Sequence, residues 1–270
     1  MKKIIALIAA LSVLLCLTAC TQEPAPTEPP PTEPPYKTVF VHTSITQELG
    51  STVNKTEFLF NEQDHVSEVV VYTNGTETKR HSVECDENGN YIRWTCDGSV
   101  MEYAYDEQGH SLGMTMYIGG EVVSSTRYTW ENGLRTSTTT TMSTQNTTTK
   151  TLMTYNAASQ LIRQDSYTAD TLSSYSIYAN DAQGRVQSMA AYQPDGTLQY
   201  KITYAWDGNT QTATLTQADG SLAQTSVMTY DENGNLLTHT VYNANNELIS
   251  KETHTWKALQ VDPDSPRASV

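Results

Sequence analysis

The segment Tyr230-Asp231-Glu232-Asn233-Gly234-Asn235-Leu236 decides the fold, because it joins an aromatic residue to a turn and then to an aliphatic residue. Asn-Gly tolerates positive φ at both central positions of a two-residue hairpin turn, so the chain is predicted to reverse here. Similar dipeptides recur along the chain: Asn-Gly begins at 74, 88, 132 and 233, and Asp-Gly at 97, 195, 207 and 219. The turns predict a series of β-hairpins.

Aromatic residues repeat with a period of 25 residues around these turns. One series consists of Tyr117, Met142, Tyr167, Tyr192, Gln217 and Tyr242. A second series holds Tyr105, Trp130, Tyr155 and Tyr230, with Tyr178, Tyr204 and Trp256 within two residues of their expected places. Internal repeats of this length indicate one supersecondary unit each, stacked against its neighbours.

The repeat predicts an all-β fold over residues 36–256. Alternation is clearest from Leu198 to Trp206, where every second residue is apolar or aromatic. Strands of about eight residues between turns give an antiparallel β-meander of about sixteen or seventeen strands. Because open sheets rarely exceed about ten strands without curling, we expect a long twisted or curled, partly closed sheet.

The threonine-rich run from Thr136 to Thr151 leaves two interpretations open. It is either a weakly packed hairpin or a spacer between two half-bodies. Threonine has a high β propensity, Met142 keeps the period, and the run has neither proline nor glycine, so the pattern favours the hairpin.

The segment around Tyr230 resembles the YD repeat of the Rhs family. Further copies are Tyr105-Asp106-Glu107-Gln108-Gly109 and Asp181-Ala182-Gln183-Gly184-Arg185-Val186, and the resemblance extends from about Phe60 to Trp256. Family members build long spiralling sheets that can enclose a cargo. The chain departs from the family in its few units and in the short stretch after Trp256, so the resemblance does not imply a C-terminal toxin domain.

The N-terminus predicts export. Lys2 and Lys3 precede an apolar stretch from Ile4 to Leu17, which is typical of a secretory signal and shorter than the roughly 20 residues that span a bilayer. Leu17-Thr18-Ala19-Cys20 resembles the lipobox of bacterial lipoproteins, which implies lipid attachment at Cys20. Two acyl chains would anchor the protein stably.

Residues 21–35 hold seven of the ten prolines and no large apolar side chain. Such a segment predicts an extended stalk, which at about 3.1 Å per residue reaches roughly 45 Å. The predicted organisation is therefore a signal peptide (1–19), the lipidated cysteine and stalk (20–35), the β-repeat domain (36–256) and a flexible tail (257–270).

Charge and motifs exclude several classes of function. The net charge of −14 becomes −16 once Lys2 and Lys3 are removed, and so acidic a surface argues against binding nucleic acid. The six histidines are scattered without metal-ligand spacing, and no nucleophile elbow, phosphate-binding loop or His-Glu-x-x-His motif occurs. Asp231, Asn233 and Asn235 resemble the start of a calcium loop but lack its glycine at the sixth position and its final glutamate. We expect neither an enzyme nor a metal or cofactor site.

Cys85 and Cys96 are predicted to be free thiols. If Asn88 and Gly89 form a two-residue loop, the two cysteines lie four positions apart along the hairpin, too far for a disulfide. If the loop is longer, so that Cys85 pairs with Tyr91, Cys96 falls on the opposite face.

Two functions remain: a surface scaffold or protein-interaction module, and a binder of glycans or cell wall. The partner would be an extracytoplasmic protein or a glycan, with the membrane reached through the lipid. The residues that distinguish them are the second aromatic series: Tyr105, Trp130, Tyr155, Tyr178, Tyr204, Tyr230 and Trp256. Packed between strands they stabilise the sheet, whereas exposed they would form a platform for sugar rings.

Overall fold

The computed structural model describes residues 36–261. The predicted signal peptide, lipid site Cys20 and stalk lie outside the described residues, as does most of the predicted tail. Residues 257–261 continue the last strand, so the tail prediction is wrong for that stretch. Among residues 36–261 no helix is long and apolar enough to cross a membrane.

The sheet has 18 antiparallel strands in chain order. The first nine are β1 (Lys37–Leu49), β2 (Thr52–Phe60), β3 (Val66–Thr73), β4 (Thr76–Cys85), β5 (Tyr91–Cys96), β6 (Ser99–Tyr105), β7 (Ser111–Ile118), β8 (Glu121–Glu131) and β9 (Leu134–Met142). After the 3₁₀ turn η2 (Ser143–Gln145) come β10 (Thr147–Tyr155), β11 (Leu161–Thr168), β12 (Thr171–Asn180), β13 (Val186–Tyr192), β14 (Leu198–Asp207), β15 (Thr210–Gln217), β16 (Leu222–Tyr230), β17 (Leu236–Asn243) and β18 (Leu248–Val261). The all-β meander is confirmed.

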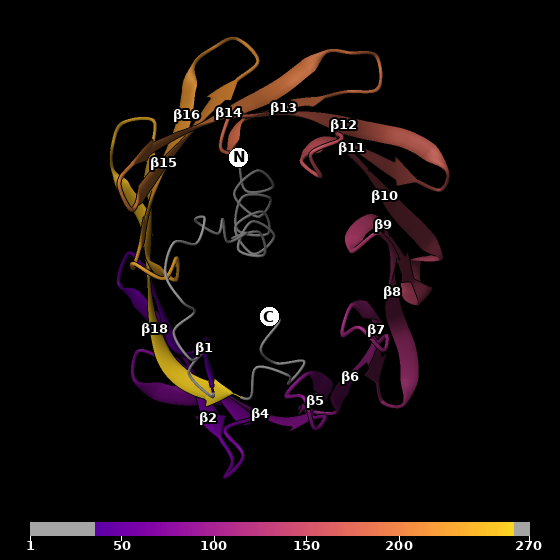
Figure 1. Cartoon of the computed structure of the whole chain (residues 1–270), viewed down its shortest axis with the longest axis vertical. Helices are drawn as coiled ribbons and strands as arrows, with labels where there is room; N and C mark the ends of the chain where they lie inside the picture. The colour runs from indigo at the N-terminus through magenta and orange to yellow at the C-terminus, as the bar shows by residue number, and fades with distance from the viewer. Residues whose placement is uncertain (1–35, 262–270) are drawn as a thin grey trace, which may run out of the picture. The chain divides into compact units, whose positions relative to one another are not determined.

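The sheet is closed, which corrects the expectation of a curled sheet with free edges. β1 pairs with β2 on one side and with β18 on the other, in a register that runs from Lys37↔Val261 to Glu48↔Lys251. Figure 1 shows the strands as a ring in which the indigo start of the chain meets the yellow end. The prediction missed this because the repeat fades before Phe60, so the β1–β2 hairpin was not recognised. Closure removes both exposed edges.

The threonine-rich run forms the hairpin that its composition favours. Thr147 pairs with Met142 and Leu152 with Ser137, so β9 and β10 continue the ladder without a spacer. Threonine hydroxyls across this region bond to one another, for example Thr126 Oγ1 and Thr140 Oγ1 at 3.0 Å.

Two turn types connect the strands. Asn74-Gly75, Asp97-Gly98 and Asn132-Gly133 are two-residue turns with positive φ at both positions, as predicted. Asn88-Gly89 and Asn233-Gly234 instead lie in longer loops, in which only the glycine has positive φ. The two-residue prediction is wrong there because an acidic side chain stabilises the longer loop.

Asp231 shows how this loop is held. Its Oδ1 accepts the backbone N–H of Asn233 at 2.9 Å and of Asn235 at 2.8 Å, and its Oδ2 accepts the Asn235 side-chain amide at 2.8 Å. Asp86 repeats these contacts with Asn88 and Asn90. The carboxylates that resembled a calcium loop therefore accept hydrogen bonds within their own loops.

Candidate functional site

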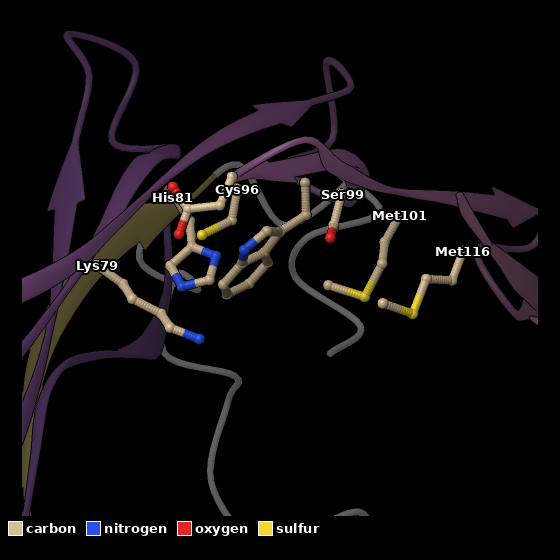
Figure 2. Close-up of a pocket in the computed structure, with 8 residues that line it drawn as sticks. Lys79, His81, Cys96, Ser99, Met101 and Met116 are labelled. Carbon is tan, nitrogen blue, oxygen red and sulfur yellow. The ribbon is translucent and has the colours of Figure 1, made fainter. Parts of the chain in front are cut away.

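The two aromatic series lie on opposite faces of the sheet. Following the register from strand to strand places the second series, from Tyr105 to Trp256, on one face together with Met101 and Met116. Figure 2 shows Met101 and Met116 pointing to the concave side of the sheet, so we call this the concave face. The tyrosines of the first series lie on the convex face: Tyr117, Tyr167, Tyr192 and Tyr242.

Side chains are buried mainly on the concave face. Met189, Ile202 and Leu215 are at most 5% exposed and lie side by side across β13, β14 and β15. A second apolar cluster is formed on the same face by Val66, Val69 and Val83, with Phe58 and Trp94 packed against it. The convex face carries ion pairs such as those of Arg80 with Glu68 and Glu77.

The aromatic residues of the concave face recur beside a β-bulge. Each bulge interrupts the ladder where an even-numbered strand turns into the next, for example between Thr129 and Trp130 or Thr154 and Tyr155. A bulge leaves a backbone group of the ladder without its regular partner. A side-chain donor on the following even-numbered strand can satisfy it.

These donors are on the repeated positions themselves. Trp130 Nε1 donates to Ser111 O at 2.7 Å, Tyr155 OH to Arg135 O at 2.8 Å and Trp256 Nε1 to Leu236 O at 2.8 Å. Two non-aromatic residues at equivalent positions do the same: Cys85 Sγ donates to Val66 O at 3.3 Å and Asn180 Nδ2 to Leu161 O at 3.0 Å. The repeat thus places a hydrogen-bond donor at each bulge.

Tyr178 and Tyr204 depart from this row. Each lies two residues earlier on its strand, because Asn180 and Trp206 occupy the equivalent positions in β12 and β14. Tyr178 OH donates to Gln164 Oε1 at 2.5 Å. Burial raises the pKa of Tyr178, and it raises the pKa of Tyr204 to about 12. The seven aromatics therefore form two adjacent rows and not a single stripe.

The remaining two members are also half-buried. Burial raises the pKa of Tyr105 to about 12. Tyr230 lies 5.5 Å from Trp206, ring centre to ring centre, and its hydroxyl is 3.5 Å from Gln211 Oε1. Sequence reasoning found these aromatic positions but not the bulges, because a bulge depends on which residues pair across strands.

A hollow of ≈ 220 Å³ lies on the concave face between β4 and β7. Its walls include Lys79, His81, Trp94, Cys96, Met101 and Met116. Figure 2 shows the imidazole of His81 beside the sulfur of Cys96. Sequence reasoning did not assign this group.

Cys85 and Cys96 are free, as predicted, although the geometric argument for it was incomplete. Cys85 pairs with Tyr91, and a bulge between Glu84 and Cys85 returns Cys96 to the same face. Distance along the hairpin alone keeps the two thiols apart.

Three of the six histidines converge on the concave face, which their scattered sequence positions did not predict. His42 Nε2 lies 3.2 Å from His254 Nδ1, and the His42 ring lies 3.5 Å from that of Trp256, centre to centre. On the next strand, His239 Nδ1 lies 3.7 Å from Glu252 Oε2, and Glu252 also accepts the amide of Gln47 at 2.8 Å. Strand closure assembles this group, which we call the histidine cluster.

Burial and its neighbours shift the titration of the histidine cluster. Burial, with His254 adding repulsion, lowers the pKa of His42 to about 4, and burial lowers the pKa of His254. Hydrogen bonding to His239 holds the pKa of Glu252 below its ordinary value. Within residues 36–261 no group of three or more His, Cys, Asp or Glu is arranged to hold a metal ion.

Replacing the indole donor at a bulge should destabilise the sheet. We expect Trp130→Phe to lower the free energy of unfolding by about 1–3 kcal/mol, because Ser111 O loses its donor. Trp94→Phe is the matched control, since Trp94 Nε1 is buried without a partner and its loss should cost little. Urea unfolding of the two variants measures the difference. Equal losses in both would contradict a role for the hydrogen bond.

Comparisons with known proteins place the chain among no established group. No protein-family model and no curated protein matches it. Two porin-like crystal structures are similar, from Bacteroides vulgatus ATCC 8482 (10% identity, TM-score 0.36, 80% of this chain and 98% of that one) and Bacteroides uniformis ATCC 8492 (10%, 0.32, 83% and 98%). The crystal structure of TcdB2-TccC3-Cdc42 is also similar (12%, 0.23, 73% and 15%). None of these similarities assigns the chain to a family.

Proposed function

We propose that the protein is a lipid-anchored extracytoplasmic scaffold that presents its β-repeat body to a protein partner. The observation that carries this proposal is the use of the repeated aromatic residues. Trp130, Tyr155 and Trp256 each donate to a backbone carbonyl of the sheet. A residue type that recurs in order to satisfy the backbone supports the framework, and needs no ligand to explain its recurrence.

The convex face supports the same proposal. Tyr175 and Tyr192 stack there at 5.0 Å between ring centres, and the guanidinium of Arg163 lies 4.5 Å from the Tyr175 ring. Arg163 in turn binds Asp165 at 2.7 Å. Tyrosine and arginine are enriched in protein interfaces, where they provide contact area and directed hydrogen bonds.

The same tyrosine pair carries the alternative function, a glycan binder, because parallel rings can stack on sugars. Retention of the purified protein on peptidoglycan and common polysaccharides separates the two. The scaffold proposal expects no retention, for the wild type or for Tyr192→Ala. Retention of the wild type that Tyr192→Ala abolishes would replace the scaffold with the glycan binder.

The anchor is tested separately with Cys20→Ser. This variant has no thiol to carry the diacylglyceryl group, so we expect it to leave the detergent phase in which the wild type partitions with membrane lipoproteins. Cys16→Ser is the matched control, since Cys16 lies inside the predicted signal peptide and its replacement should leave partitioning unchanged. Equal partitioning of Cys20→Ser and the wild type would exclude the anchor.

A further inference from the structure

Three sulfur atoms and an imidazole line the hollow between β4 and β7. They belong to Cys96, Met101, Met116 and His81. Each comes from a different strand, and all four side chains lie on the concave face. In Figure 2 the sulfur of Cys96 lies beside the His81 ring, and the thioethers of Met101 and Met116 lie beside each other.

The strand register brings the two pairs within reach of one another. Ser82 pairs with Thr95, so the next residues outward, His81 and Cys96, are opposite each other. Met101 pairs directly with Met116 and lies two residues from Ser99, the partner of Cys96. Diagonal neighbours in a sheet are about 7–8 Å apart, which long side chains bridge. Methionine, unbranched with three rotatable bonds, adapts to such gaps.

The donor atoms are largely uncommitted. His81 Nδ1 is buried and has no hydrogen-bond partner. Cys96 is a free thiol. Met101 Sδ receives only a weak contact from Tyr103 OH, at 3.8 Å. A buried imidazole nitrogen without a partner calls for an explanation, because leaving it unpaired costs free energy.

We propose that this hollow binds a monovalent soft metal ion, Cu(I), through Cys96, His81, Met101 and Met116. Thiolate and thioether sulfurs select Cu(I), and imidazole also suits copper. A group with three sulfurs disfavours Mg²⁺ and Ca²⁺, which require oxygen ligands. The site does not depend on the proposed scaffold function.

Binding exchanges one proton for one ion. The Cys96 S–H bond breaks, its proton passes to solvent, and the thiolate sulfur bonds to Cu(I), with no change in oxidation state. Burial and the neighbouring Asp97 raise the pKa of the Cys96 thiol, while burial and Lys79 lower the pKa of His81. The thiol is thus protonated before the ion arrives, whereas the imidazole is already neutral and able to coordinate.

Cu(I) titration against a chromophoric Cu(I) chelator, under reducing and anaerobic conditions, tests the site. The full chain is used with Cys16 and Cys20 both changed to Ser, so that Cys85 and Cys96 are the remaining thiols. We expect one Cu(I) per chain, and X-ray absorption with both sulfur and nitrogen in the first shell. Cys96→Ser should abolish binding, and the double variant Met101→Leu/Met116→Leu should weaken it by about tenfold or more.

Met228→Leu is the matched control for the methionines, since Met228 also lies on the concave face and receives a tyrosine hydroxyl, that of Tyr230, at 3.7 Å. It should bind Cu(I) like the wild type, as should Cys85→Ser. Circular dichroism checks that each variant is folded, and the double methionine variant still decides the question if Cys96→Ser does not fold. Unchanged affinity in the double variant, or equal losses in Cys85→Ser and Cys96→Ser, would reduce the result to ordinary thiol binding and overturn the proposal.

Discussion

Gly113→Ala is expected to destabilise the protein by about 3 kcal/mol or more, the largest effect of any single methyl group in the described chain. Gly113 lies within β7 and has a φ of 144°, which side chains rarely adopt. A Cβ at this position would lie 2.0 Å from Thr126 O and 3.0 Å from Arg127 Cα, both on the neighbouring β8. These are backbone atoms, so the strands must separate to admit the methyl group.

Gly109→Ala distinguishes this clash from the general cost of placing alanine at positive φ. Gly109 has a φ of 83°, and a Cβ there meets nothing within 4 Å. We expect a loss of about 1 kcal/mol for this control. Urea unfolding of the two variants should show the Gly113→Ala midpoint well below the other. Similar midpoints would show that β7 and β8 can separate at little cost.

Acidification from pH 6.5 to pH 4 is expected to remove about 2 kcal/mol of stability through His42, after allowance for its half-buried position. The folded-state pKa of His42 is lowered to about 4, so the unfolded chain binds more protons between these values. Stability therefore rises with pH across this window. His254 acts in the same direction, because its folded-state pKa is lowered as well.

The other charged member of the histidine cluster extends the loss to lower pH. The folded-state pKa of Glu252 is lowered mainly by His239, so its contribution is present above its unfolded pKa and disappears as the folded carboxylate is protonated. His42→Phe keeps a ring against Trp256 and Phe58 but cannot titrate. We expect the free energy of unfolding of this variant to depend less on pH between 6.5 and 4. A wild-type stability that is flat over this range would refute the assignment, as would an unchanged slope in His42→Phe.

Local chemistry made much of the fold readable from the sequence. Positive φ in Asn74-Gly75 and alternation around Ile202 are properties of short segments, so the turns and strands followed from them. The period of 25 residues placed Trp130 and Tyr155 at equivalent positions before any pairing was known. β propensity likewise placed the threonine-rich run in a hairpin.

Pairing between distant segments decided the rest. Closure depends on β1 meeting β18, more than 200 residues away, and no local pattern encodes which edge finds which. The bulges shift the register by one residue, and that shift put Cys96 on the same face as Cys85, reversing the simple alternation rule. Because His42, His239 and His254 lie on strands that meet only when the sheet closes, the sequence alone determined their chemistry, and the tertiary structure determined their proximity.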